Sequence, residues 1–278
     1  MHWFITVLAL NTLLCFVAVA HAGERQRIIT LAPHLTEWVY LLGAQDDIVG
    51  VSAFSDVPAQ AAEHPVIADA NGVNFRQILK LKPSIILAWE GGNKPQDLTR
   101  LESLGFTLFH SSVKTPQDIA RELRELGRLL SKQSRAEALA DEFITTLNAI
   151  DAKFSRAQAK FLHPVLFYLS TTPMMSIGEH AWANQVLRYC GAETIFTDAP
   201  TDYPEVRVTE VLRRQPVALI TPIDASPAQL ALFWTPHQKV LNAPIIAVEG
   251  DIIHRFTPRL TQILPHLCTR IHAAAAAD

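Results

Sequence analysis

Signatures of the common catalytic and nucleotide-binding sites are missing from this sequence. Its 278 residues contain no G-x-S-x-G nucleophile elbow, no phosphate-binding loop, no G-x-G-x-x-G, no H-E-x-x-H and no C-x-x-C. Each of these motifs holds a nucleophile, a phosphate or a metal at a defined backbone position. Because none is present, we expect a protein that is not an enzyme.

Long runs of charge of one sign are also missing. The 24 basic and 27 acidic side chains leave a net charge of −3. Nucleic acid is normally bound by a basic patch, and membrane surfaces attract polybasic segments, so neither partner is expected. Apolar residues make up 49% of the chain and charged residues 18%, which is enough to bury a sizeable core. At about 150 residues per domain, the length predicts two lobes or one large α/β unit.

A long hydrophobic run occurs only once, at the amino terminus. Residues 1–22 contain no Lys, Arg, Asp or Glu, and residues 3–20 are almost all apolar. The run ends in Ala20-His21-Ala22, a small-x-small pattern after which signal peptidase cleaves. We therefore expect residues 1–22 to be a cleaved signal peptide. The alternative is a retained membrane anchor, because a run of this length can just span a bilayer.

Cysteine is scarce, with three residues in the whole sequence. Cleavage after Ala22 would leave only Cys190 and Cys268. An even pair in an exported protein suggests a disulfide, formed in an oxidising compartment. Two buried free thiols are the alternative that the residues alone leave open.

Short apolar segments alternate with helical patterns along the chain, which is typical of a parallel α/β sheet. The expected strands are residues 28–31, 48–52, 84–88, 107–109, 165–169, 217–221 and 245–248. Between the fourth and the fifth of these strands, apolar residues recur at three- and four-residue intervals, which predicts a long helix. They are Leu139, Phe143, Leu147, Ile150, Phe154 and Phe161.

The two halves of the chain repeat one local pattern. Residues 74–83 and 207–216 both predict a short helix that stops at a proline and leads into an apolar strand. We therefore expect two Rossmann-like α/β lobes with parallel sheets, residues 23–133 and 164–278, joined by one long α-helix over residues 134–163. Open α/β sheets bind ligands at the carboxyl ends of their strands, so the ligand cleft should lie between the lobes.

Segments that follow strands carry the candidate cleft residues. They are Phe54, Trp89, Gly91, Gly92, Asn93 and Tyr203. A tryptophan beside two glycines at the end of a strand can offer a flat apolar face while the backbone approaches the ligand closely. Phe54 and Tyr203 are expected to face the same cleft. Packing in the core or at its rim is the alternative for each aromatic residue.

Residues 250–255 follow the last expected strand. Asp251 and Arg255 lie four positions apart in this loop and can present acceptors and donors to polar groups of a ligand. The alternative is a local ion pair that braces the loop.

Four histidines also lie just after expected strands or in neighbouring loops: His34, His110, His180 and His254. If they converged, they could bind a transition metal or a haem iron. A secreted metal-binding protein or metalloenzyme is therefore the hypothesis from another class. Loop histidines without a fixed spacing are more often polar surface residues, and no metal ligand is assigned.

Several of these segments carry the motifs of one family. They are residues 28–33 (Ile-Ile-Thr-Leu-Ala-Pro) with Thr36 and Glu37, residues 51–58 (Val-Ser-Ala-Phe-Ser-Asp-Val-Pro), residues 81–83 (Leu-Lys-Pro), residues 88–93 (Ala-Trp-Glu-Gly-Gly-Asn), residues 184–187 (Asn-Gln-Val-Leu), residues 190–192 (Cys-Gly-Ala), and residues 251–255 with Pro258 and Arg259. With them, nearly the whole chain after residue 27 resembles the periplasmic cobalamin-binding proteins of bacterial ABC importers. These proteins belong to a wider class that binds siderophores, haem or cobalamin.

This resemblance implies a periplasmic monomer that captures a corrinoid, cobalamin above all, and delivers it to an inner-membrane ABC permease and ATPase complex. It implies contacts to the corrin ring from Phe54, Trp89 and Tyr203. Contacts to the polar edge of the ligand are implied for Asp251, Ile252, Ile253, His254 and Arg255. It also supports the pairing of Cys190 with Cys268. No cofactor is implied apart from the transported cobalamin, and haem or a ferric siderophore is the alternative cargo.

Three positions depart from the family pattern. A further cleft aromatic of well-known members falls on Ala70. The surface glutamate with which each lobe docks on the permease falls on Arg76 and Thr209, and only Glu210, one position on, is acidic. The details of transporter docking should therefore differ in this chain. The sequence leaves open whether cobalamin or cobinamide is the preferred corrinoid.

Overall fold

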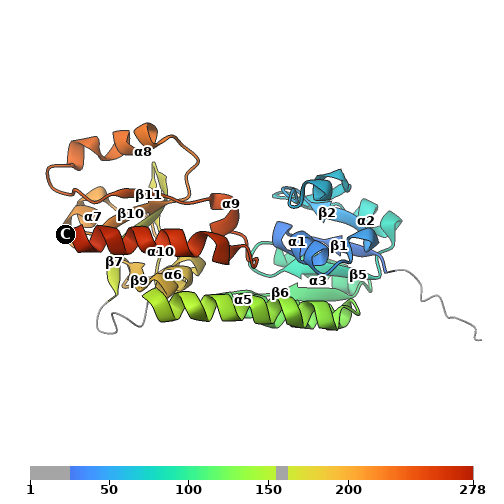
Figure 1. The fold of residues 1–278 in the computed structure, drawn as a ribbon. Coiled ribbons are helices and arrows are strands. Elements are labelled where there is room, and N and C mark those ends of the chain that lie inside the picture. Colours follow the sequence, from blue (N-terminus) through green and yellow to red (C-terminus); the bar gives the residue numbers. More distant parts are fainter. Residues whose placement is uncertain (1–25, 155–161, 278) are drawn as a thin grey trace, which may run out of the picture.

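The computed structural model describes residues 26–154 and 162–277, and the expected signal peptide lies outside these residues. Two α/β lobes stand side by side, and one long helix runs along both of them (Figure 1). Among the described residues, no helix combines the length and the apolar composition needed to span a bilayer.

The first lobe is built on a six-stranded sheet with the strand order β4-β3-β2-β1-β5-β6. Its strands are β1 (Ile28–Thr30), β2 (Ile48–Ser52), β3 (Val66–Asp69), β4 (Gly72–Val73), β5 (Ile85–Trp89) and β6 (Leu108–Ser111). Its helices are α1 (Pro33–Leu41), α2 (Phe75–Leu81), α3 (Pro95–Ser103) and α4 (Pro116–Leu129). All neighbouring strands are parallel except β4, which pairs antiparallel with β3 after a tight turn.

The second lobe repeats this plan with the strand order β11-β10-β7-β8, and β9 pairs with β7. Its strands are β7 (His163–Thr171), β8 (Met174–Ser176), β9 (Ala192–Thr194), β10 (Ala218–Thr221) and β11 (Ile245–Ala247). Its helices are α6 (Trp182–Leu187), α7 (Val208–Arg214), α8 (Pro227–Trp234), α9 (Gly250–Ile253) and α10 (Leu260–Ala277), with a short 3-10 helix, η4 (Arg188–Cys190), after α6. Only β8 is antiparallel to its neighbour, because it folds back on β7 in a hairpin.

The linking helix α5 covers Gln133–Phe154 and is about 33 Å long at 1.5 Å per residue. It packs against α4 of the first lobe and against η4 and α10 of the second lobe. The expected helix over residues 134–163 is longer than this, since His163 already belongs to β7. Phe161, expected on the buried face of the helix, lies outside the described residues.

Helices α2 and α7 confirm the repeat expected from the sequence. Each has seven residues and ends at a residue in the left-handed conformation, Lys82 (φ 46°) or Gln215 (φ 47°). A proline follows in both cases, and β5 or β10 begins two residues later. Because a residue before proline avoids the helical region, the Lys-Pro and Gln-Pro steps end the two helices at equivalent points.

One apolar cluster runs through both lobes and along α5. It contains Ile28 and Leu87 of the first sheet, Leu147 of α5, and Val165 and Ile220 of the second sheet. The opposite face of each sheet has a cluster of its own, with Ile29 and Ile86 in the first lobe and Leu166 and Leu219 in the second. Strands buried on both faces read as continuous apolar runs, which is why the sequence predicts most of them.

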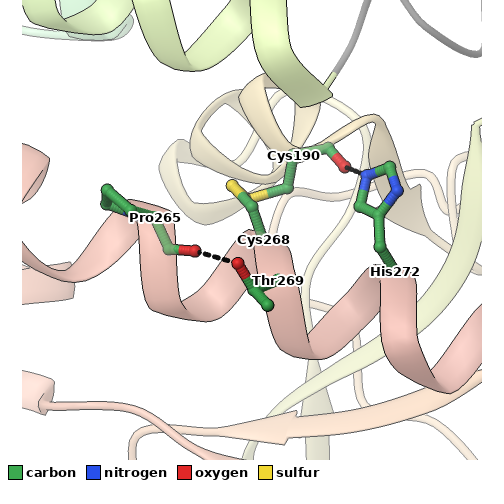
Figure 2. The surroundings of a disulfide bond; sticks show 5 residues. All are labelled: Cys190, Pro265, Cys268, Thr269 and His272. Carbon is green, nitrogen blue, oxygen red and sulfur yellow. Dashed lines mark hydrogen bonds between the residues drawn. A yellow bond between two sulfur atoms is a disulfide. The ribbon is translucent and has the colours of Figure 1, made fainter.

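The expected disulfide joins Cys190 at the end of η4 to Cys268 of α10 (Figure 2). Both cysteines are fully buried. A ring nitrogen of His272 lies 2.9 Å from the carbonyl oxygen of Cys190, and the Thr269 hydroxyl donates to the Pro265 carbonyl at 2.7 Å (Figure 2). The bridge therefore ties the end of α6 and η4 to the helix that closes the second lobe.

Replacing both Cys190 and Cys268 by alanine should lower the free energy of unfolding by about 4 kcal/mol, because the bridge removes the entropy of a loop of 78 residues from the unfolded chain. Urea unfolding of the oxidised protein and of the double variant measures this difference. A reductant should weaken the wild type by the same amount and leave the variant unchanged. Equal stability of the two proteins would contradict the expectation.

Candidate ligand-binding cleft

A pocket of about 570 Å³ lies between the two lobes. This volume is in the range of about 300–1,000 Å³ that is usual for small-molecule sites. The first lobe lines it with residues that follow β5 and β6, and the second lobe lines it around α6 and the loop before α7. Its lining includes Trp89, Gly91, Val113, Lys114, Thr115, His180, Ala181, Trp182, Gln185, Asp202, Tyr203 and Phe256.

Trp89 ends β5, and its ring folds over the two glycines that follow. A Cβ atom on Gly92 would lie 2.0 Å from the ring, and one on Gly91 would lie 2.7 Å from its Nε1 atom. Both positions therefore require glycine. The Asn93 side chain accepts from the Trp89 amide at 2.8 Å and donates to the Leu31 carbonyl at 2.8 Å. The Asn93 amide thus supports the turn that holds the Trp89 ring.

Phe256 forms the floor of the pocket between the lobes. Its ring packs edge-on against His34 at 5.2 Å and Trp89 at 5.4 Å in the first lobe, and against Trp182 at 4.7 Å in the second, measured between ring centroids. Its backbone carbonyl accepts from the Trp38 indole at 2.9 Å. Phe256 and Trp182 are not among the residues that the sequence predicts for the cleft. The only sequence signal for Phe256 was its place directly after Arg255.

His34 lies in this aromatic floor and does not meet the other candidate histidines. It is 3% exposed, and burial lowers its pKa to about 3, so the imidazole is neutral. The centroid of its ring lies 5.4 Å from that of Trp38 and 5.6 Å from that of Trp89. Its Nε2 atom lies 3.3 Å from the Ser111 hydroxyl oxygen. His34 is therefore a packing residue of the cleft floor.

Two acidic side chains fix the backbone of the loop between β6 and α4. Lys114 of this loop lines the pocket. Glu122 accepts from the Ser111 hydroxyl at 2.6 Å and from the Ser112 amide at 3.0 Å, and burial raises the pKa of this carboxyl. Asp118 accepts from the Lys114 and Thr115 amides at 3.1 and 2.8 Å. The backbone of this rim is therefore fixed before any ligand binds.

Arg255 links a second group of candidate residues across the lobes. Its guanidinium lies 2.7 Å from Asp56 and donates to the Phe54 carbonyl at 3.4 Å, both in the first lobe. The expected local partner, Asp251, is farther away at 3.6 Å. Phe54 itself is 80% exposed and adopts a left-handed backbone with φ 62°, which is rare for a bulky residue. Arg255 thus contacts the backbone of Phe54, and the ring of Phe54 is exposed.

A half-buried ion pair joins the two lobes. Arg259 of the second lobe donates two hydrogen bonds of 2.8 Å to the Glu37 carboxylate on α1, and Glu37 is 3% exposed. The hydrogen bonds to Glu37 raise the pKa of Arg259 above its usual value. With Arg255 and Phe256, this pair makes residues 255–259 a strap across the back of the cleft.

The remaining candidates fall into different surroundings. Tyr203 is 54% exposed and lines the pocket opposite Trp89. Ile252 and Ile253 are buried, since α9 turns its apolar side into the second lobe, and His254 is exposed near Phe167. Among the residues that the structure describes, no three His, Cys, Asp or Glu side chains come together to hold a metal.

The expected docking residues lie on the equivalent helices α2 and α7. Arg76 and Thr209 are exposed at the first turns of these helices. Glu210 is not a free acid, because Arg213 at 2.5 Å and Arg214 at 2.7 Å bind its carboxylate and lower its pKa to about 2. Two arginines of the same helix therefore compensate the charge of the only carboxylate expected in this part of the surface.

Residues 28–224 match the periplasmic binding protein family. The chain belongs to this family. It is 35% identical to the vitamin B12-binding protein of Pectobacterium carotovorum subsp. carotovorum over 94% of this chain and 92% of that protein. The vitamin B12-binding protein BtuF of Vibrio cholerae has a similar structure, with a TM-score of 0.81, 32% identity, and coverage of 90% of this chain and 98% of that one.

Periplasmic haem-binding proteins share the fold. The haem-binding protein HutB of Vibrio cholerae matches with a TM-score of 0.76 over 88% of this chain and 98% of that chain, at 19% identity. A likeness at this identity concerns the architecture of the two lobes and their linking helix.

Burial of the His34 imidazole should make the stability of the protein depend on pH. Its pKa is about 3 when folded, against an ordinary value of 6.5, so in this window the unfolded chain binds a proton that the folded chain does not. The free energy of unfolding should therefore fall as the pH falls below 6.5, by about 2 kcal/mol at pH 5 from this group.

Urea unfolding at pH 7 and pH 5 measures this contribution when the wild type is compared with His34→Phe, which keeps an aromatic ring. The variant should lose this part of the pH dependence. His266→Phe on the exposed side of α10 is the matched control and should keep it. The same pH dependence in wild type and His34→Phe would contradict the assignment.

Proposed function

We propose that this chain is a periplasmic solute-binding protein that captures a corrinoid, cobalamin above all, and delivers it to an ABC transporter. The observation that carries this proposal is the pocket in which Trp89 of one lobe and Tyr203 of the other line the same space. Aromatic faces from two lobes suit a large, flat, largely apolar ring. The vitamin B12-binding relatives at 31–35% identity support the same cargo.

In this proposal the protein binds its cargo and catalyses no reaction. The corrin ring is desolvated against Trp89, whose orientation is already set by Gly91, Gly92 and Asn93 and by the ring of Phe256. A side chain that is ordered before binding loses little entropy when the ligand arrives, which favours affinity.

Polar groups at the two ends of the cleft orient the ligand. Lys114, Gln185 and Asp202 line the pocket and can pair with amide groups at the edge of a corrinoid. At the other end, the exposed Asp251 lies near Arg255, and the ring of Phe54 is also exposed. His254 directly precedes Arg255 in the sequence. Ile252 and Ile253 act indirectly, because they anchor α9 in the core of the second lobe.

Export and delivery complete the proposal. Residues 1–22 act as a cleavable signal peptide, the mature chain works as a monomer, and its lobes are residues 23–133 and 164–278. The transporter contacts the exposed first turns of α2 and α7, where Arg76 and Thr209 stand in place of acidic residues. Since Glu210 is bound by two arginines, the complementary surface of this transporter should carry acidic side chains.

Trp89→Ala should weaken cobalamin binding by about 1–3 kcal/mol, the usual loss for a large aromatic contact at the centre of a site. Calorimetric titrations with cobalamin, cobinamide, haem and a ferric siderophore measure the affinity and identify the cargo. Phe233→Ala, on α8 outside the pocket, is the matched control and should bind as the wild type does. Tight binding of haem or a siderophore without corrinoid binding would refute the proposed cargo.

Arg76→Glu should slow cobalamin uptake by the cognate transporter and leave the affinity for cobalamin unchanged, because the exposed guanidinium lies on α2 and does not line the pocket. Uptake into proteoliposomes that contain the transporter measures this effect. Arg128→Glu, an exposed arginine at the end of α4, is the control and should not change uptake. Unchanged uptake by Arg76→Glu would exclude Arg76 from the docking surface.

A further inference from the structure

One of the four candidate histidines, His180, lines the pocket between the lobes. The other three have different positions. His34 is buried in the aromatic floor, and His110 lies between the carboxylates of Glu90 at 3.4 Å and Glu102 at 3.0 Å. His254 is exposed beside α9 and does not line this pocket. Among these four histidines, His180 alone presents an imidazole in this pocket that is free to bind a ligand.

The turn that carries His180 is firmly held, although its imidazole is not. The Glu179 carbonyl accepts from the side-chain amides of Asn184 at 2.8 Å and Gln185 at 2.9 Å. The Gly178 amide donates to the Asp202 carbonyl at 2.9 Å, which joins this turn to the loop of Tyr203. The His180 side chain is 78% exposed, and its nearest charged neighbour, the Glu179 carboxylate, is 4.0 Å away.

His180 and Trp89 come to the same pocket from opposite lobes. A flat macrocycle that lies on an aromatic ring with one face leaves the other face, with the metal at its centre, open to the opposite wall. Neutral imidazole is a strong ligand for transition-metal ions of this kind. The side chains of the pocket thus provide a stacking surface on the first lobe and a metal ligand on the second.

We propose that His180 binds the cobalt of the captured corrinoid as an axial ligand when the corrinoid does not fill that position with a base of its own. An imidazole nitrogen forms a bond to Co(III), the bond from cobalt to a water ligand breaks, and the water leaves with no change in oxidation state. The inference rests on the proposed corrinoid cargo. It predicts that His180 holds base-free corrinoids such as cobinamide through a bond between nitrogen and cobalt. In cobalamin, a base of the ligand itself makes this bond.

The test is a visible-absorption titration of the full mature protein with diaquacobinamide, in which both axial positions hold exchangeable water. Binding to the wild type should shift the absorption bands and reach saturation at one equivalent. His180→Ala should abolish the shift and weaken binding by at least the ~10–100-fold that loss of an outer-shell partner costs at protein metal sites. His266→Ala, on the exposed side of α10, is the matched control and should behave as the wild type does.

Dicyanocobinamide separates metal ligation from the rest of the site, because cyanide blocks both axial positions. His180→Ala and wild type should bind it with affinities within about threefold of each other, a difference below 1 kcal/mol. In the Co(II) form, which has no axial nitrogen of its own, electron paramagnetic resonance should show splitting by one nitrogen in the wild type and none in His180→Ala.

The outcomes separate this inference from the proposed function. Tight binding of diaquacobinamide without a band shift, or with a shift that survives in His180→Ala, overturns the role of His180 and leaves the corrinoid cargo standing. Failure to bind any corrinoid overturns both. A shift that depends on His180 with ferric haem, but with neither corrinoid, overturns the inference by assigning the imidazole to iron.

Discussion

The ion pair between the buried Glu37 carboxylate and the half-buried Arg259 fixes how the two lobes face each other. A carboxylate that is 3% exposed costs several kcal/mol unless a cation compensates it, and the two parallel hydrogen bonds from Arg259 provide this compensation. The pair joins α1 of one lobe to the segment before α10 of the other. It connects the lobes on the side opposite to their link through α5, so a wide opening would leave the buried Glu37 carboxylate without its partner.

The cleft depends on this connection because its floor is made by the same strap. Phe256 lies between Arg255 and Arg259 in sequence and between Trp89 and Trp182 in space. Trp89 is held from below by this ring and from the side by its own glycine turn. The aromatic wall is therefore in place without a ligand, which would favour affinity in the proposed function, because a group that is already ordered loses little entropy on binding.

In the proposed function, cargo recognition is separate from the surface that meets the transporter. The pocket takes its lining from the ends of β5 and β6 and from α6, whereas α2 and α7 present exposed arginine and threonine on helices that do not line it. Because Arg213 and Arg214 neutralise Glu210 within α7, the charge of that surface differs from the acidic pattern expected for the family. The two recognition tasks can thus vary independently.

The sequence by itself determined the elements that depend on local patterns. Apolar runs predicted strands such as β2 and β5, and the repeat that ends at Pro83 and Pro216 predicted equivalent helices in two lobes. Only the tertiary structure decided the rest. Glu37 and Arg259 are 222 positions apart and the Trp38 indole reaches a carbonyl 218 positions away, so no periodicity reports these contacts. Such pairs form only when the two sheets pack along one helix, and that packing places Phe256 beside Trp89.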